Sequence, residues 1–174
     1  MKRILFVTNE SNHGGAEKML IWLANKMAEY DCYQIYFCNL NSNSPFYSLN
    51  NKIKLILFDR PLNENFIYRN TIGFIQKSWF INSIIKKNKI DMVVNFNDHA
   101  YYNILFCRLF TKFKILVSQR VDPSSIVSKT GRFRLKLIKY ADGLVCQTKP
   151  ALDFFDSIFS KSAMVIPNPI YTKY

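Results

Sequence analysis

Three polar segments carry the groups best suited to chemistry. Asp98 and His99 are adjacent, and either side chain can take a proton from a hydroxyl group near neutral pH. Arg120 can hold a phosphate through two parallel hydrogen bonds. Gly14 and Gly15 let backbone N–H groups approach an anionic or hydroxyl-rich ligand closely at the start of a predicted helix.

Each of these segments also has a purely structural interpretation. The glycine pair is equally compatible with a plain turn between a strand and a helix. Asp98 is a good capping residue for a helix that begins near His99, and capping does not exclude a functional role. Arg120 has a nearby acidic partner for a surface ion pair in Asp122.

Apolar runs of strand length alternate with segments of helical periodicity about six times. This alternation predicts an α/β fold with a doubly wound, mostly parallel sheet and helices on both of its faces. The candidate groups follow predicted strands, so we expect them to meet at the carboxyl edge of the sheet, where such folds bind ligands. The segments expected to converge there are 11–17, 97–99, 119–122 and Asn168. The last helix is predicted to have Pro150 in its first turn and to run to about Phe159.

A long helix predicted over 66–89 has two apolar stripes where one is enough for a core. One stripe contains Tyr68, Ile72, Ile75 and Trp79, and the other contains Phe74, Ile81, Ile84 and Ile85. Lysines lie beside these stripes, so the stripe that the core does not need could lie in a membrane interface. The alternative is that a neighbouring helix or loop of the protein covers it.

The net charge of +12, from 24 basic and 12 acidic residues, favours an anionic partner. The four scattered cysteines form no C-x-x-C pair and are expected to be reduced, buried thiols of a cytoplasmic protein. The first apolar run is too short for a signal peptide, and no run reaches the length of a spanning helix.

Several common site motifs are absent. The sequence has no G-x-G-x-x-G after its first strand, no P-loop, no Cys/His cluster with metal spacing and no D-x-D. We therefore expect no metal and no cofactor.

Five segments, in order, resemble motifs of GT4-type glycosyltransferases of the GT-B fold. Residues 12–20 resemble the G-G-A-E-x-x-L opening, and 91–96 look like the next landmark. Residues 118–123 resemble the S-E-R-N-x-P stretch of members that extend lipid-linked or capsular glycans. Residues 141–148 and 165–170 resemble the A-D-x-x-v-x-x-S/T strand and the v-i-p-N-P-i signature.

The resemblance implies a Rossmann-like N-terminal, acceptor-binding domain over 1–167 and the start of an interdomain linker over 168–174. The donor domain of such enzymes follows that linker, so it is expected to be absent, and the chain alone is expected to be inactive. The whole enzyme would be a retaining transferase for cell-surface polysaccharide or glycan synthesis, with a nucleotide-sugar as co-substrate.

The resemblance also implies roles for individual residues. Gly14, Gly15, Ala16 and Glu17 would approach the donor phosphates and the reacting sugar. The acceptor would be bound by His13, Asn97, Gln119 and Arg120, beside the catalytic candidates Asp98 and His99. Many relatives have Glu or His where Gln119 stands, and an amide cannot act as a base, which favours Asp98 or His99 in that role.

The expected acceptor is a polyprenyl-phosphate-linked molecule or a glycan, and the basic charge fits attachment to an anionic membrane surface. We therefore expect a cytoplasmic, peripheral location at the inner face of the membrane. A second hypothesis is a non-catalytic binding or membrane-tethering module that partners a separate glycosyltransferase subunit. Nucleic-acid binding is suggested only by the charge, with no supporting motif.

Overall fold

The computed structural model describes residues 1–9, 14–41, 44–59, 71–96 and 99–169. Seven strands form one all-parallel sheet in the order β3-β2-β1-β4-β5-β6-β7. The strands are β1 (Lys2–Thr8), β2 (Tyr33–Asn39), β3 (Lys54–Leu57), β4 (Met92–Asn95), β5 (Lys114–Gln119), β6 (Gly143–Cys146) and β7 (Ser162–Val165). The predicted fold class is confirmed.

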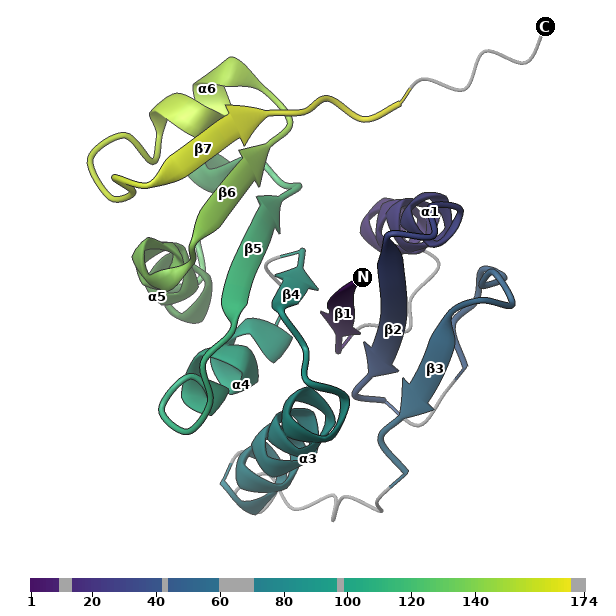
Figure 1. The fold of residues 1–174 in the computed structure, drawn as a ribbon. Coiled ribbons are helices and arrows are strands. Elements are labelled where there is room, and N and C mark those ends of the chain that lie inside the picture. Colours follow the sequence, from purple (N-terminus) through teal and green to yellow (C-terminus); the bar gives the residue numbers. More distant parts are fainter. Residues whose placement is uncertain (10–13, 42–43, 60–70, 97–98, 170–174) are drawn as a thin grey trace, which may run out of the picture.

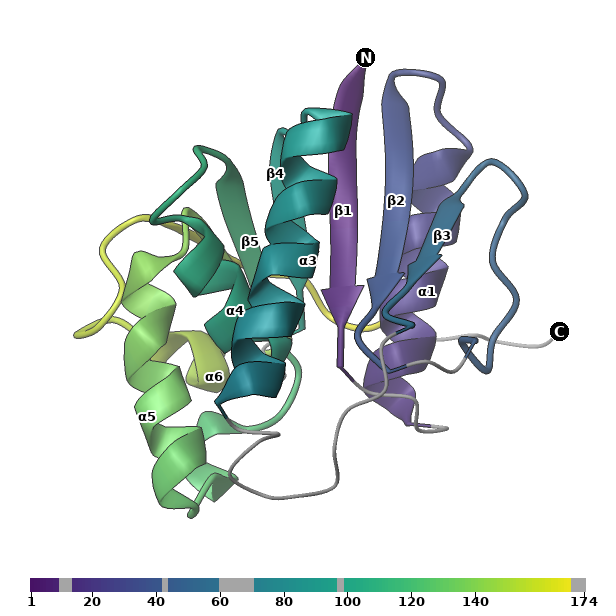
Figure 2. The same cartoon turned by 90° about the horizontal axis from the view of Figure 1, so that it is seen from below.

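The helices are α1 (Gly15–Ala28), α3 (Ile72–Asn88), α4 (Ala100–Cys107), α5 (Lys129–Leu137) and α6 (Lys149–Asp153). Short 3-10 turns lie at η1 (Pro123–Ser125) and η2 (Ile138–Tyr140). Figures 1 and 2 show α1 on one face of the sheet and α3, α4 and α5 on the other. The strand order reverses between β1 and β4, which is where ligands bind in such sheets.

Two apolar cores follow from this layering. Ile4, Phe6 and Leu20 belong to the core between α1 and the sheet. Leu5, Ile85 and Ile104 belong to the larger core beneath α3 and α4, which continues to α5 and α6. Neighbouring residues of β1 alternate between the two cores because successive strand side chains point to opposite faces.

Helix α3 begins at Ile72, whereas the sequence predicted a helix from 66; residues 60–70 lie outside the described part. Of its two apolar stripes, Ile81, Ile84 and Ile85 are buried in the core. Trp79, from the other stripe, remains 55% exposed. The described residues therefore leave the spare stripe largely uncovered.

Two further expectations need correction. Helix α6 ends at Asp153, although the sequence predicted a helix to about Phe159, because the chain turns from Phe154 onward. Three of the four cysteines are buried thiols as expected, but Cys32 is exposed in the turn before β2.

Candidate functional site

The junction between β1 and α1 leaves an open surface at the carboxyl edge. Helix α1 starts after Gly14, whose φ of −79° and ψ of 155° are extended backbone. A methyl group added at Gly14 or Gly15 would meet nothing within 4 Å. Packing inside the described chain therefore gives no reason for glycine here, and the first-turn N–H groups of α1 face an approachable surface. His13 lies outside the described residues.

Ala16 and Glu17 form the first turn of α1 with Gly15. Ala16 is half-buried, and Glu17 is only 3% exposed. A carboxylate in the first helical turn interacts favourably with the helix dipole. Glu17 therefore contributes to the electrostatics beneath this surface, while the backbone of Gly14 and Gly15 forms the surface itself.

Asparagine side chains join the strand ends at the switch point. Asn95 ends β4 fully buried, and its Nδ2 group donates to the Val7 carbonyl of β1 at 3.0 Å. At the neighbouring strand, the Asn41 Nδ2 group donates to the Asn9 carbonyl at 2.6 Å. Sequence reasoning missed these amides. For Asn95 the signal was an asparagine near the end of an apolar run, and Asn41 lies two residues after Asn39, which ends β2.

His99 occupies the N-cap position of α4 and is exposed at the same edge. Its ring lies 6.4 Å from the ring of Tyr102, one helical turn along. Its side chain makes no capping hydrogen bond. Asn97 and Asp98 lie outside the described residues, so the choice between capping and catalysis for Asp98 stays a prediction.

Arg120 connects three segments of the carboxyl edge. Its Nη1 group donates to Asn168 Oδ1 at 2.8 Å, and its guanidinium carbon lies 4.6 Å from the centre of the Phe96 ring. Asp122 instead accepts hydrogen bonds from the backbone and hydroxyl of Ser124, at 2.9 and 2.8 Å. The alternative of an Arg120–Asp122 surface ion pair is therefore not what the structure shows.

Arg120 is also partly desolvated. Its Nε atom is buried without a hydrogen-bond partner in the described structure, and burial lowers the pKa of the guanidinium from its usual value. Burial raises the pKa of the neighbouring Cys146 thiol to about 11, an effect that Arg120 partly offsets. The thiol stays neutral, and Arg120 keeps a donor for an anion.

Gln119 ends β5 and is 3% exposed. Its Nε2 group donates to the Val121 carbonyl at 2.7 Å, so the amide is turned back on its own loop. In this position Gln119 shapes the loop that presents Arg120.

A pocket of about 1080 Å³ adjoins the edge on the side of α3, α4 and α5. Its edge end contains Asn9, Asn41, Lys77 and His99. Its interior is lined by apolar side chains of α3 and α4 and of α5 with its following turn, among them Phe74, Leu105, Phe106, Leu109 and Leu137.

Two features are absent from the described residues. Among them, no three His, Cys, Asp or Glu side chains gather in a way that would hold a metal ion. None of the helices in that part of the chain combines the length and apolar character needed to cross a membrane.

The chain is similar in sequence to an α-1,4-N-acetyl-D-galactosaminyltransferase of Campylobacter jejuni, whose name gives a diNAcBac-PP-undecaprenol-linked acceptor. The two are 22% identical over 175 residues, which cover 98% of this chain and 47% of the relative. The chain therefore spans about half the length of that relative. No protein-family model matches.

Solved glycosyltransferases share the fold. Sucrose-phosphate synthase of Thermosynechococcus elongatus matches with a TM-score of 0.73 at 11% identity, over 96% of this chain and 48% of that one. The lipopolysaccharide outer core galactosyltransferase WaaB matches with a TM-score of 0.70 at 15% identity, over 99% and 47%. Anabaena HepE, solved with UDP and glucose, matches with a TM-score of 0.66 at 12% identity, over 98% and 45%.

The sequence motifs, the seven-stranded parallel sheet and these likenesses agree with one another. The chain has the fold of one half of a GT-B glycosyltransferase, as its motifs predicted.

Proposed function

We propose that this chain is the acceptor-binding half of a retaining, GT4-type glycosyltransferase. The enzyme transfers a sugar from a nucleotide-sugar to a lipid-linked or glycan acceptor in cell-surface polysaccharide or glycan synthesis. A second domain, in the same polypeptide or in a partner subunit, supplies the main donor site.

The observation that carries this proposal is the likeness along 98% of the chain to a transferase whose named acceptor is linked to undecaprenol through a diphosphate. The site supports it independently. The open first turn of α1, exposed His99 and partly desolvated Arg120 all lie at the carboxyl edge of the sheet.

Each group has a proposed role. The backbone at Gly14 and Gly15 approaches the donor phosphates and the reacting sugar across the cleft between the two halves. Arg120 binds the acceptor's phosphate through its remaining donors. His99 or Asp98 takes the proton from the attacking hydroxyl, because Gln119 has no basic group.

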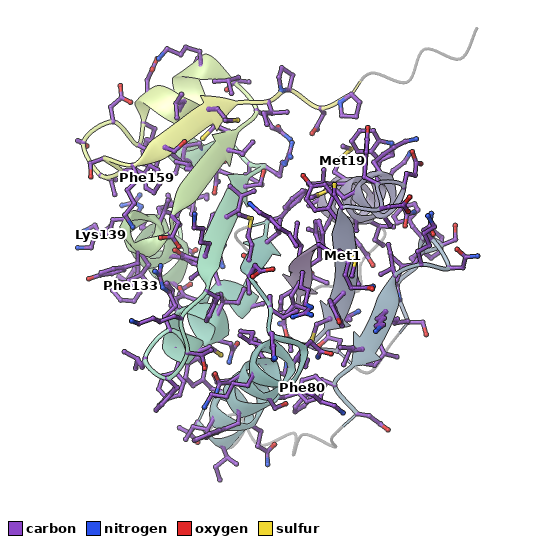
Figure 3. The ribbon with its side chains drawn as sticks, viewed as in Figure 1. Met1, Met19, Phe80, Phe133, Lys139 and Phe159 are labelled. Atoms are coloured by element: carbon purple, nitrogen blue, oxygen red, sulfur yellow. The ribbon has the colours of Figure 1, made fainter. Side chains whose placement is uncertain are left out.

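Basic and apolar side chains on the α3–α5 side favour a peripheral location at the cytoplasmic membrane face. Lys86, Lys87 and Lys89 are exposed at the end of α3. Figure 3 shows Phe133 and Lys139 on the side of α5 that faces away from the sheet. Each Lys or Arg near an anionic surface contributes about 1 kcal/mol of attraction.

The test is a calorimetric titration of the chain with a short-chain prenyl-diphosphate sugar and, in parallel, with a panel of UDP-sugars. We expect the prenyl-diphosphate sugar to bind and the UDP-sugars to bind weakly or not at all. The variant His99→Ala should weaken acceptor binding, with Tyr30→Ala as an exposed control far from the edge. Tight UDP-sugar binding without acceptor binding would contradict the proposed division between the halves. Unchanged acceptor recognition in His99→Ala would favour the non-catalytic module.

A further inference from the structure

The pocket between α3, α4 and α5 is larger than a site for one phosphate or one sugar requires. We propose that it holds the first isoprene units of a prenyl-diphosphate-linked acceptor, with the diphosphate at the carboxyl edge and the chain running along α4. This inference rests on the proposed function and adds the location of the lipid.

The interior of the pocket suits a hydrocarbon because the polar side chains of α4 that line it are already hydrogen-bonded to the protein. The Asn103 Nδ2 group donates to the Phe74 carbonyl at 3.0 Å and to Ser78 Oγ at 2.9 Å. The Tyr102 hydroxyl donates to the Thr130 carbonyl at 2.9 Å. A polar ligand would find few remaining partners here, whereas an apolar chain would bury the exposed carbon surface.

Charges at the two ends of the pocket set the direction of the ligand. At the far end, the Arg108 Nη1 group lies 3.1 Å from Asp142 Oδ2, and Lys161 Nζ lies 4.0 Å from Asp142 Oδ1, so this one acid offsets part of the positive charge there. At the carboxyl edge, Arg120 has a buried Nε atom without a hydrogen-bond partner in the described structure, and Lys77 donates to the Asn9 Oδ1 atom at 2.8 Å. An anionic head group is therefore favoured at the edge.

A row of aromatic rings leads from the pocket to the exterior. The Phe74 and Phe106 rings, which line the pocket, have centroids 5.5 Å apart, and Phe106 lies 5.3 Å from Phe110. Phe110 stacks on Trp79 at 5.6 Å. Trp79 and Phe110 are 55% and 48% exposed, so a chain longer than the pocket has an apolar exit toward a lipid phase.

The test compares binding of inorganic diphosphate, geranyl diphosphate and farnesyl diphosphate to the chain by calorimetry, below the concentrations at which the lipids form micelles. Each buried CH₂ tightens binding about fourfold, so one added isoprene unit should improve the affinity by at least about tenfold while it fits the pocket. A dissociation constant that does not change with chain length would overturn the inference.

Two matched variants locate the effect. Leu109→Asp places a charge in the pocket wall at a position that is 74% exposed, so the fold tolerates it. Leu55→Asp makes the same change at an exposed position on β3, away from the pocket. Leu109→Asp should remove the gain with chain length and leave diphosphate binding intact, while Leu55→Asp should change neither.

The outcomes separate this inference from the proposed function. Equal behaviour of the two variants would exclude the pocket as the lipid site, even if the diphosphate-linked sugar still bound. The protein could also bind anionic vesicles while Leu109→Asp leaves the dependence of affinity on prenyl chain length unchanged. That result would show that this surface contacts only bulk lipid, and it would overturn the inference. If affinity rises with prenyl chain length but the sugar of the prenyl-diphosphate sugar makes no difference to binding, the result would contradict the proposed function alone.

Discussion

Replacing Arg120 with lysine tests the anion site without changing the net charge. Lysine keeps the positive charge but presents no planar fork, so it cannot reproduce both the contact with the Phe96 ring and the 2.8 Å hydrogen bond to Asn168. Long-range attraction of an anionic acceptor is therefore the same in both proteins, and any difference reports local geometry.

The magnitude follows from the contacts. A hydrogen bond that involves a charged group contributes about 1.5–3 kcal/mol. Loss of one such bond to the acceptor phosphate therefore predicts a dissociation constant that is roughly 10- to 100-fold larger. The same change should lower the free energy of unfolding by only about 1 kcal/mol, because the guanidinium is partly exposed and its stacking on Phe96 is worth about 0.5–1 kcal/mol.

The assay is a titration with prenyl diphosphate, together with a urea unfolding curve for each variant. Arg132→Lys, at an exposed position on α5, is the matched control for the chemical change. Equal affinities for wild type, Arg120→Lys and Arg132→Lys would refute the assignment of a phosphate to Arg120. Equal losses in both variants would mean that arginines bind the ligand only through general charge.

Other substitutions test the scaffold. Tyr101→Phe removes the 3.0 Å hydrogen bond to the Leu137 carbonyl and should lower the free energy of unfolding by about 1–2 kcal/mol, measured in urea. Gly15→Ala should leave that free energy unchanged or raise it by up to about 1 kcal/mol, and should weaken donor binding in the two-domain enzyme; a large stability loss would show that its methyl group is not accommodated. Exposed Cys32 should be the one thiol that reacts rapidly with Ellman's reagent before unfolding. Burial raises the pKa of Cys146 from 9.0 to about 11, so the unfolded chain loses that proton first and stability should fall as the pH rises above about 9.

The sheet was accessible from the sequence because its central strands are apolar on both faces. Short continuous apolar runs such as 4–7 and 93–94 are typical of strands that are buried on both faces of a parallel sheet. The polar residues that follow these runs mark the carboxyl edge of the sheet. Helix ends were less predictable. The apolar periodicity continues through Phe154, Phe155 and Phe159, although the chain leaves the helix after Asp153.

The arrangement of the site could be predicted only in part. Convergence at the carboxyl edge follows from parallel topology, and the contact between Arg120 and Asn168 confirms it for those two segments. Their specific bond joins residues 48 positions apart and depends on how side chains pack. The pocket lies between three successive helices that strands separate in the sequence, so no local pattern indicates it.

The strand order also has a consequence for how the chain folds during synthesis. Strand β1 is translated first, but one of its edges pairs with β4, where the Arg3 backbone N–H donates to an Asp91 carboxylate 88 positions later. At typical translation rates that delay is roughly 4 to 18 seconds. During this time the nascent β1–β2 pair has an unpaired apolar edge that can join other chains. We therefore expect that yield in cells depends on how well this edge is protected until β4 leaves the ribosome.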